Sequence, residues 1–266
     1  MNIRLLIVLI LNSILLSTAV IAQDISLGDT VLGSYETRFH YRGADIIRNR
    51  AHNIRKAIRM LDGTILRPDE TLSYNRLLGP RTGSRGWRQA KTILDGEIFI
   101  DFGGGICQVS STLHAAAVLS GMHIVEAQHH SRYMTYIEPG LDATVNWRQP
   151  DLIIRNPYDF PVRIHAWEKE TGIVAIEFFG EQKIWEITIE RNEIERRHHR
   201  TEIRERTDRP ISYRHILERG TNFLIIDQWI HRRNLETEEL ISERTRIQYD
   251  SSPRIIEIGT MPEVEE

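Results

Sequence analysis

The residue of this chain best suited to covalent chemistry is Cys107, its only cysteine. It follows the triplet Gly103–Gly105 and begins an apolar, alanine-rich run that ends at Gly121. Such a run is typical of a buried helix, which places Cys107 in the first turn. There, unpaired backbone N–H groups and the positive end of the helix dipole stabilise a thiolate. The pattern indicates a nucleophile; a small side chain simply packed at a helix start is the alternative.

A thiol nucleophile needs a base, and the following segment supplies two histidines and an acid. His129 and His130 precede Asp142 in strand-like surroundings. A cysteine on a helix, then His and Asp on neighbouring strands, is the chain order of papain-like and transglutaminase-like thiol enzymes. Neighbours on a strand point to opposite faces, so one of the two histidines is expected to be structural or to face solvent, and we favour His130 as the base. Asp142 would orient the imidazole, or instead cap the turn after Pro139.

Substrate contacts are expected close to the cysteine. The preceding glycines let the backbone approach a substrate and turn N–H groups toward an oxyanion. The residues predicted to contact a substrate are Gly104, Gly105, Ser110, Ser131, Tyr74, Arg81 and Arg132. The arginines would bind a carboxylate, unless they are ordinary surface cations. His114, seven residues after Cys107, is expected to pack in the core.

A metal centre is the natural rival for a set of Cys and His residues. The adjacent pairs His129–His130 and His198–His199 diverge on a strand and do not converge on one ion. The chain also lacks the Cys-x-x-Cys and His-Glu-x-x-His spacings of zinc sites. We therefore expect no metal and no cofactor.

Two helices and an antiparallel sheet are predicted around these residues. Apolar side chains recur every three or four residues from Ile47 to Leu61, which predicts a helix that ends at Gly63. Its other face carries cations that we interpret as solvated: Arg48, Arg50, Arg55, Lys56 and Arg59. Short apolar runs that predict strands lie at 98–102, 124–126, 133–137, 143–147, 152–154, 162–167 and 173–178. The expected class is α+β, with the Cys-bearing helix packed on an antiparallel sheet.

A second, all-β module is predicted after Gly180. Apolar residues alternate with charged ones from Trp185 onward, and strand-like runs recur at 223–226 and 254–260. The predicted organisation is therefore a leader at 1–22, a first domain at 23–182 and a β-rich module at 183–266. The net charge of −3 leaves no pervasive basic surface, which argues against a nucleic-acid partner.

The first two dozen residues predict export. Arg4 precedes the apolar stretch Leu5–Leu16, and small residues follow at Val20 and Ala22. This is the pattern of a signal peptide cleaved after Ala22; an uncleaved membrane anchor is the alternative. The expected location is secreted or in the cell envelope, with membrane contact only through an uncleaved leader.

A set of short motifs forms one recognisable pattern; they lie at 103–113, 130–131, 140–145, 151–152 and Asn156, and upstream at 50–54, 61–64, 68–71, Ser73, 79–82 and Ala90. Through these motifs the chain resembles the VanW family over about residues 32–180. VanW domains occur in exported bacterial cell-wall proteins, and some members act as L,D-transpeptidases that join peptidoglycan stem peptides through a cysteine. The closing Ile258–Thr260 resembles the end of the five-glycine module that often follows VanW domains and is proposed to bind cell-wall sugars, although few of that module's glycines are present.

The resemblance implies a role for each residue of the constellation. Cys107 would attack a stem-peptide carbonyl and form a thioester, while the terminal D-amino acid leaves. His130 would activate the thiol and later deprotonate the acceptor amine, and Asp142 would orient the imidazole. Backbone N–H groups from Gly105 to Cys107 would bind the oxyanion. Two alternatives stay open: a thiol peptidase that hydrolyses the same bond, and a non-catalytic cell-wall binding protein.

Overall fold

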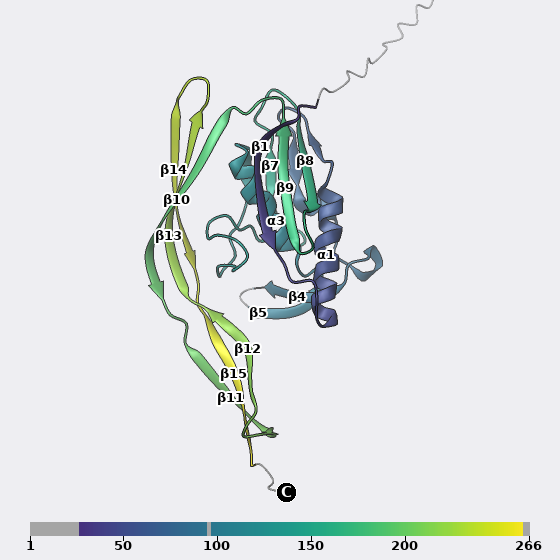
Figure 1. Cartoon of the computed structure of the whole chain (residues 1–266), viewed down its shortest axis with the longest axis vertical. Helices are drawn as coiled ribbons and strands as arrows, with labels where there is room; N and C mark the ends of the chain where they lie inside the picture. Colours follow the sequence, from purple (N-terminus) through teal and green to yellow (C-terminus); the bar gives the residue numbers. More distant parts are fainter. Residues whose placement is uncertain (1–26, 95–96, 263–266) are drawn as a thin grey trace, which may run out of the picture.

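The computed structural model describes residues 27–94 and 97–262. The predicted leader, residues 1–22, therefore lies outside the described residues. Within them, no helix has the length and apolar character needed to cross a bilayer. The described chain forms an α+β body, residues 27–180, and a strand-rich module, residues 185–262, that extends beside and beyond it (Figure 1).

Two long helices and one short helix belong to the body. The first, α1 (Asp45–Leu61), agrees with the predicted helix and buries the apolar face that its spacing indicated. The short α2 (Tyr74–Leu78) is capped by Ser73, whose hydroxyl accepts a hydrogen bond from the Arg76 N–H. The helix α3 (Ile106–Leu119) is buried along nearly its whole length. Its small residues let neighbouring elements approach it from several sides.

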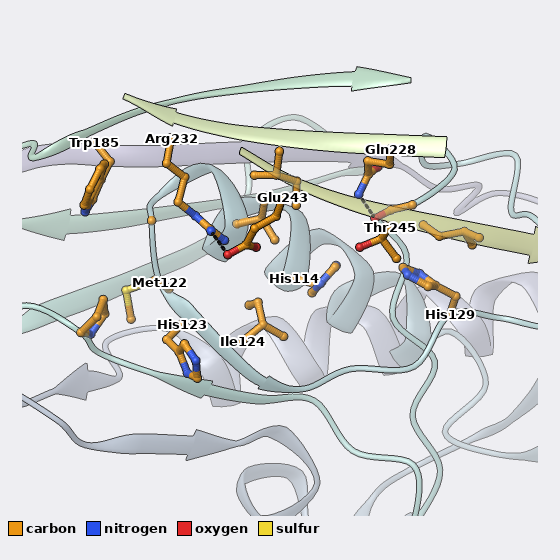
Figure 2. A pocket seen from close by; sticks show the side chains of 16 residues that line it. His114, Met122, His123, Ile124, His129, Trp185, Gln228, Arg232, Glu243 and Thr245 are labelled. Atoms are coloured by element: carbon orange, nitrogen blue, oxygen red, sulfur yellow. Dashed lines mark hydrogen bonds and ion pairs between the residues drawn. The ribbon is translucent and has the colours of Figure 1, made fainter. Parts of the chain in front are cut away.

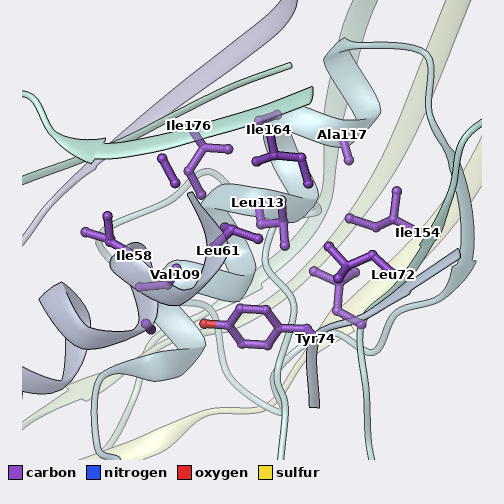
Figure 3. Close-up of a cluster of buried hydrophobic side chains, with 14 of the residues drawn as sticks. Ile58, Leu61, Leu72, Tyr74, Val109, Leu113, Ala117, Ile154, Ile164 and Ile176 are labelled. Carbon is purple, nitrogen blue, oxygen red and sulfur yellow. The ribbon is translucent and has the colours of Figure 1, made fainter. Parts of the chain in front are cut away.

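The main sheet of the body is antiparallel. Its order is β1–β9–β8–β2, formed by Thr30–Arg38, Ile173–Gly180, Val162–Glu168 and Ile65–Leu66. The helix α3 packs against β1 and β9, and α1 packs against β8. Leu113 and Val109 of α3 meet Ile176 and Ile164 of the sheet in a continuous core (Figure 3). Each such side chain contributes about 2 kcal/mol through burial, so α3 is held firmly in place.

Two smaller β elements complete the body. One sheet has the order β3–β7–β6, formed by Thr71–Ser73, Ile153–Arg155 and His123–Glu126. A hairpin, β4–β5, is formed by Gln89–Leu94 and Glu97–Phe102 and leads into the glycine triplet.

The predicted strands at 133–137 and 143–147 are wrong. Both runs belong to an irregular segment, residues 127–147, which we call the His–Asp loop. Its backbone groups bond locally and to α3: the Thr144 N–H donates to the Gln128 carbonyl over 2.8 Å, and the Ala143 N–H donates to Ser111 Oγ over 3.0 Å. Because side chains of α3 take these backbone groups, no ladder forms.

The module contains six strands in two sheets. They are β10 (Trp185–Arg197), β11 (Thr201–Pro210), β12 (Arg214–Thr221), β13 (Phe223–Asn234), β14 (Leu240–Tyr249) and β15 (Ser252–Met261). The orders are β10–β13–β14 and β11–β15–β12, with β11 and β15 parallel. In Figure 1, β10, β13 and β14 run beside the body and the other sheet extends past it. The exact division at 182/183 stays a prediction.

Candidate active site

The turn into α3 determines where Cys107 lies. Gly105 precedes the helix with φ +107°, a conformation that other residues rarely adopt. A Cβ on Gly105 would lie 2.9 Å from Arg50 Cγ and 3.1 Å from Ile54 Cγ1 of α1. Glycine is therefore required both for the turn and for the close approach of α1. This turn makes Cys107 the second residue of α3. Its side chain is half-buried and forms no disulfide.

His130 is held by Asp142 through two hydrogen bonds to one oxygen. The His130 backbone N–H and its Nδ1 lie 2.7 and 2.8 Å from Asp142 Oδ2. Asp142 is 1% exposed and sits beside its partners as a carboxylate, so Nδ1 carries the proton that it donates. Cys107 and His130 line one cavity, and each shifts the pKa of the other. The printed contacts of the sulfur are with the Val145 carbonyl at 3.4 Å and Thr144 Oγ1 at 4.0 Å. The three predicted catalytic residues thus lie together, with the His130–Asp142 pair beside the sulfur.

The charges of the three side chains support one another. Burial lowers the pKa of His130, but the contacts with Asp142 and Cys107 outweigh it and raise that pKa to about 9. Burial raises the pKa of the Cys107 thiol. The neighbouring His130 lowers it by more, so the net shift is downward. Burial also opposes ionisation of Asp142, yet both histidines hold its pKa well below the usual range. Both shifts favour the charged forms, a thiolate beside an imidazolium.

Three cavities meet around this pair. One of about 170 Å³ reaches Cys107 between Arg81, Gly105 and Trp147. A second of about 90 Å³ reaches Cys107 and His130 from the side of Arg50 and Tyr136. A third of about 160 Å³ borders His130, Ser131 and Asn146. Thr92 of the β4–β5 hairpin lines all three, so the hairpin lies across the approach to the sulfur.

Three of the predicted binding residues line these cavities: Gly105, Arg81 and Ser131. Arg81 is fixed by hydrogen bonds from Nη2 to Asn75 Oδ1 and from Nη1 to the Gly79 carbonyl, at 2.5 and 2.9 Å. Its guanidinium lies over the Trp147 ring, 5.6 Å from the centroid. Its Nε has no protein partner within the described residues. Arg81 therefore offers a pre-positioned cation beside the cysteine.

The other four predicted binding residues do not line the cavities around Cys107. Tyr74 is wholly buried and donates to the Ile106 carbonyl over 3.2 Å, so it supports the start of α3. Ser110 donates to the Ala143 carbonyl over 2.7 Å and holds the His–Asp loop. Gly104 packs against β4, where a Cβ would meet the Lys91 carbonyl at 2.6 Å. Arg132 is buried near Glu218 of the module, with 3.9 Å between Nη1 and Oε2. All four side chains or backbones therefore contact other parts of the protein and do not line the cavities at Cys107.

The family model described as VanW like protein matches residues 49–179. This chain carries a VanW-like domain. Among curated proteins, the "Uncharacterized protein YoaR" of Bacillus subtilis is 41% identical over 135 residues, which are 51% of this chain and 43% of that protein. The "Vancomycin B-type resistance protein VanW" of Enterococcus faecalis is 27% identical over 151 residues, 54% of each chain. The chain spans about half the length of these relatives.

Two solved structures are similar to a smaller part of the chain. The "IgA1 Protease G5 domain structure" is 20% identical with a TM-score of 0.19, and it covers 31% of this chain and 99% of its own. The "Crystal structure of HP0197-G5" is 16% identical with a TM-score of 0.17, and it covers 28% and 99%.

Arg50 is a site residue of the VanW-like domain that the sequence reasoning missed. It was interpreted as part of the solvated face of α1, yet its Nη2 donates to Gln108 Oε1 over 2.7 Å and it lines the cavity beside Cys107. Burial lowers its pKa, and the neighbouring Tyr136 and Cys107 act in the opposite direction. One signal was available, because Arg50 begins a stretch that follows the family pattern.

His129 also differs from the prediction. It does not point away from His130, because the segment is irregular and not a strand. Its Nδ1 lies 3.4 Å from Asp142 Oδ1 and 3.1 Å from the Asp142 carbonyl oxygen. Both histidines therefore meet one carboxylate, from different sides.

A larger cavity of about 400 Å³ lies between the VanW-like domain and the module, and does not include Cys107 or His130. His114 and His129 border it from the body, while Trp185, Arg232 and Glu243 border it from the module (Figure 2). His114 is buried, as expected, and its Nδ1 lies 2.9 Å from the Leu141 carbonyl.

Within the described residues, no three His, Cys, Asp or Glu side chains are grouped so as to hold a metal ion.

Proposed function

We propose that this protein is an exported cell-wall enzyme that transfers acyl groups between peptidoglycan stem peptides, in the manner of an L,D-transpeptidase. One observation carries the proposal: the half-buried Cys107 and His130 line one cavity, and His130 Nδ1 lies 2.8 Å from Oδ2 of the buried Asp142. A nucleophile, a base and an orienting acid in this order are the requirements of thiol acyl transfer.

The reaction follows from the charges of the pair. The Cys107 thiolate attacks the stem-peptide carbonyl, and the backbone N–H groups of Gly105 and Cys107 stabilise the oxyanion, since the Ile106 N–H already donates to the Gly103 carbonyl. The C–N bond to the terminal D-amino acid breaks as the His130 imidazolium gives its proton to the leaving amine. The acceptor amine then attacks the thioester and loses a proton to His130. The C–S bond breaks, and the thiolate–imidazolium pair is restored.

Two further observations support a peptide substrate with a carboxylate. Arg81 lines the cavity beside Cys107 and has an unpartnered Nε within the described residues. Arginine is suited to planar recognition of a carboxylate. A relative is named a vancomycin B-type resistance protein, which supports a role at the cell wall.

The test is to incubate the mature protein with tetrapeptide stems and examine protein and peptides by mass spectrometry. Transfer predicts an acyl adduct on Cys107 together with cross-linked dimers. An adduct with shortened stems and no dimers would replace transfer by hydrolysis. Equal peptidoglycan binding by wild type and Cys107→Ala, with the stems unchanged in both, would leave a binding protein and refute catalysis.

A further inference from the structure

The His–Asp loop lies between α3 on one side and the module on the other. On the α3 side, Ser110 Oγ donates to the Ala143 carbonyl over 2.7 Å. On the module side, the turn at Gly140 is held by two strands. Gln228 Nε2 of β13 donates to the Gly140 carbonyl over 3.2 Å, and Arg191 Nε of β10 donates to the Pro139 carbonyl over 2.7 Å. The module therefore fixes the segment that carries His130 and Asp142.

Tyr249, the last residue of β14, makes the most direct of these contacts. Its side chain is fully buried, and its hydroxyl lies 2.5 Å from Asp142 Oδ1. The Gly140 N–H donates to the same hydroxyl oxygen over 2.7 Å. Because that oxygen already accepts a hydrogen bond from Gly140, its own proton is directed to the carboxylate. A residue 107 positions away thus completes the contacts of Asp142.

The two oxygens of Asp142 accept hydrogen bonds from different residues. Oδ2 accepts both hydrogen bonds from His130, and Oδ1 accepts the one from Tyr249. The other donor near Oδ1 is His129 Nδ1, at 3.4 Å. Without the Tyr249 hydroxyl, a buried carboxylate oxygen would lose its short hydrogen bond, and the carboxylate would turn toward His129. That rotation moves Oδ2 away from His130.

A second contact ties the end of β14 to the other side of His130. The Asp250 N–H donates to the Ser131 carbonyl over 2.6 Å. Tyr133 packs edge-on against Tyr249, with 6.3 Å between the ring centroids. The backbone after His130 and the carboxylate beside it are therefore held by the same two residues of the module.

We propose that Tyr249 is a positioning residue that acts on His130 through Asp142, so that the C-terminal module forms part of the catalytic site. Its meaning for catalysis rests on the proposed acyl-transfer function. Its effect on Cys107 is measurable without any substrate, because a well-placed imidazolium keeps the neighbouring thiol ionised.

The titratable groups that face Cys107 and His130 come from several elements. They are Arg50 of α1, Tyr74 of α2, Arg81 of the following turn, Lys91 and Asp101 of the β4–β5 hairpin, and His129, Tyr136 and Asp142 of the His–Asp loop. Removing the Tyr249 hydroxyl changes none of these groups chemically. A shift in thiol ionisation would therefore report a change in their placement.

The experiment measures the rate of iodoacetamide alkylation against pH in the mature protein. Cys107 is the sole thiol of the chain, so the reaction reports this site alone. We expect Tyr249→Phe to raise the pH midpoint by half a unit or more, which is about a twofold lower rate at the wild-type midpoint and about a threefold lower rate well below it. Tyr133→Phe, which removes a hydroxyl from the neighbouring ring, should overlay the wild type. A midpoint that is unchanged or lowered in Tyr249→Phe overturns the proposal.

Two further variants separate positioning from general loosening. In an Asp142→Asn background, Tyr249→Phe should cause no additional shift, because the residue through which it acts is already altered. Tyr249→4-aminophenylalanine, which keeps a donor in place, should restore the wild-type profile. If Tyr249→Phe does not fold, this rescue variant and Gln228→Ala decide the matter: a shifted profile in the rescue variant, or a wild-type profile in Gln228→Ala, overturns the proposal.

The outcomes also distinguish this inference from the proposed function. A wild-type midpoint equal to that of a free thiol overturns the function itself. Equal, low midpoints in wild type and Tyr249→Phe overturn the role of Tyr249 alone.

Discussion

The body and the module use their apolar residues in different ways. The core of the body is continuous from α1 through α3 to the main sheet, and Leu113 at its centre is fully buried. The buried cluster of the module is confined to Leu224, Ile226, Ile247 and Tyr249, and Tyr133 of the body packs against it. A deep core can hold a buried ion pair in one geometry. The module is best packed where it meets the body, so its order depends on that contact.

The largest effect predicted by this comparison concerns Cys107, whose chemistry only the body can support. Cys107→Ala should lower the proposed acyl transfer by at least about 10³-fold, because it removes the only thiol of the chain. The rate is measured by dimer formation from tetrapeptide stems. Ser212→Ala in the module, a substitution of similar size, is the control. Transfer by Cys107→Ala at the wild-type rate would show that the chemistry does not depend on Cys107 of the body.

The next effect is on stability. Leu113→Ala opens a cavity at the centre of the body and should lower the free energy of unfolding by about 2 to 5 kcal/mol. Urea titration followed by circular dichroism measures it. A loss below about 1 kcal/mol would mean that the core around α3 is not the main source of order.

The ion pair predicts a third effect, on pH dependence. The raised pKa of His130 gives stability that is lost as pH rises through about 9, and the lowered pKa of Cys107 gives stability that is lost as pH falls through the folded value. The free energy of unfolding should therefore be highest between about pH 6.5 and 8.5 and fall on the acid side by up to about 1.4 kcal/mol per unit. His130→Ala should reduce the decrease on the acid side, because the pKa of Cys107 is then lowered less. An unchanged curve in that variant would show that other groups cause it.

The same pair should be visible in thiol reactivity. In His130→Ala, burial still raises the pKa of Cys107 while the main group that lowers it is gone, so the pKa rises and alkylation at pH 7 should slow at least about tenfold. His114→Ala is the matched control, since His114 is also buried but lies beside the larger cavity. Equal slowing in both variants would argue for a general loosening of the body.

The smallest effect belongs to the module. Ile203 of β11 is 60% exposed, so Ile203→Ala should change the free energy of unfolding by less than about 0.5 kcal/mol. The same urea titration measures it. A loss comparable to that of Leu113→Ala would reveal a partner surface on β11 and reverse the comparison.

The sequence predicted the elements whose pattern is local. The spacing from Ile47 to Leu61 matches α1, because one helix face is buried and the other is not. The strand β1 was missed, since a register shift between Val31 and Gly33 interrupts its alternation. The run at 133–137 has strand-like composition but pairs with no described strand, and its Tyr136 hydroxyl instead donates to the Cys107 carbonyl of α3. Composition alone does not predict this arrangement.

The residues of the candidate site also differ in whether local sequence could predict them. Cys107, His130 and Asp142 were predicted because their types and order suffice to suggest chemistry, and the structure brings them together. Arg50 was misread, because a cation on a helix surface gives no sign of what packs over it. Tyr249 could not be found at all, because 107 residues separate it from Asp142 and only the tertiary fold joins them.

The proton that His130 shares with Asp142 has a kinetic consequence. With Nδ1 committed to the carboxylate, a single ring nitrogen remains to serve the sulfur and every incoming or departing amine. Two amines cannot use it at once, so the first product must depart before the second substrate is deprotonated. Acyl transfer on this scaffold would follow ping-pong kinetics, with parallel lines in double-reciprocal plots as the acceptor concentration is varied.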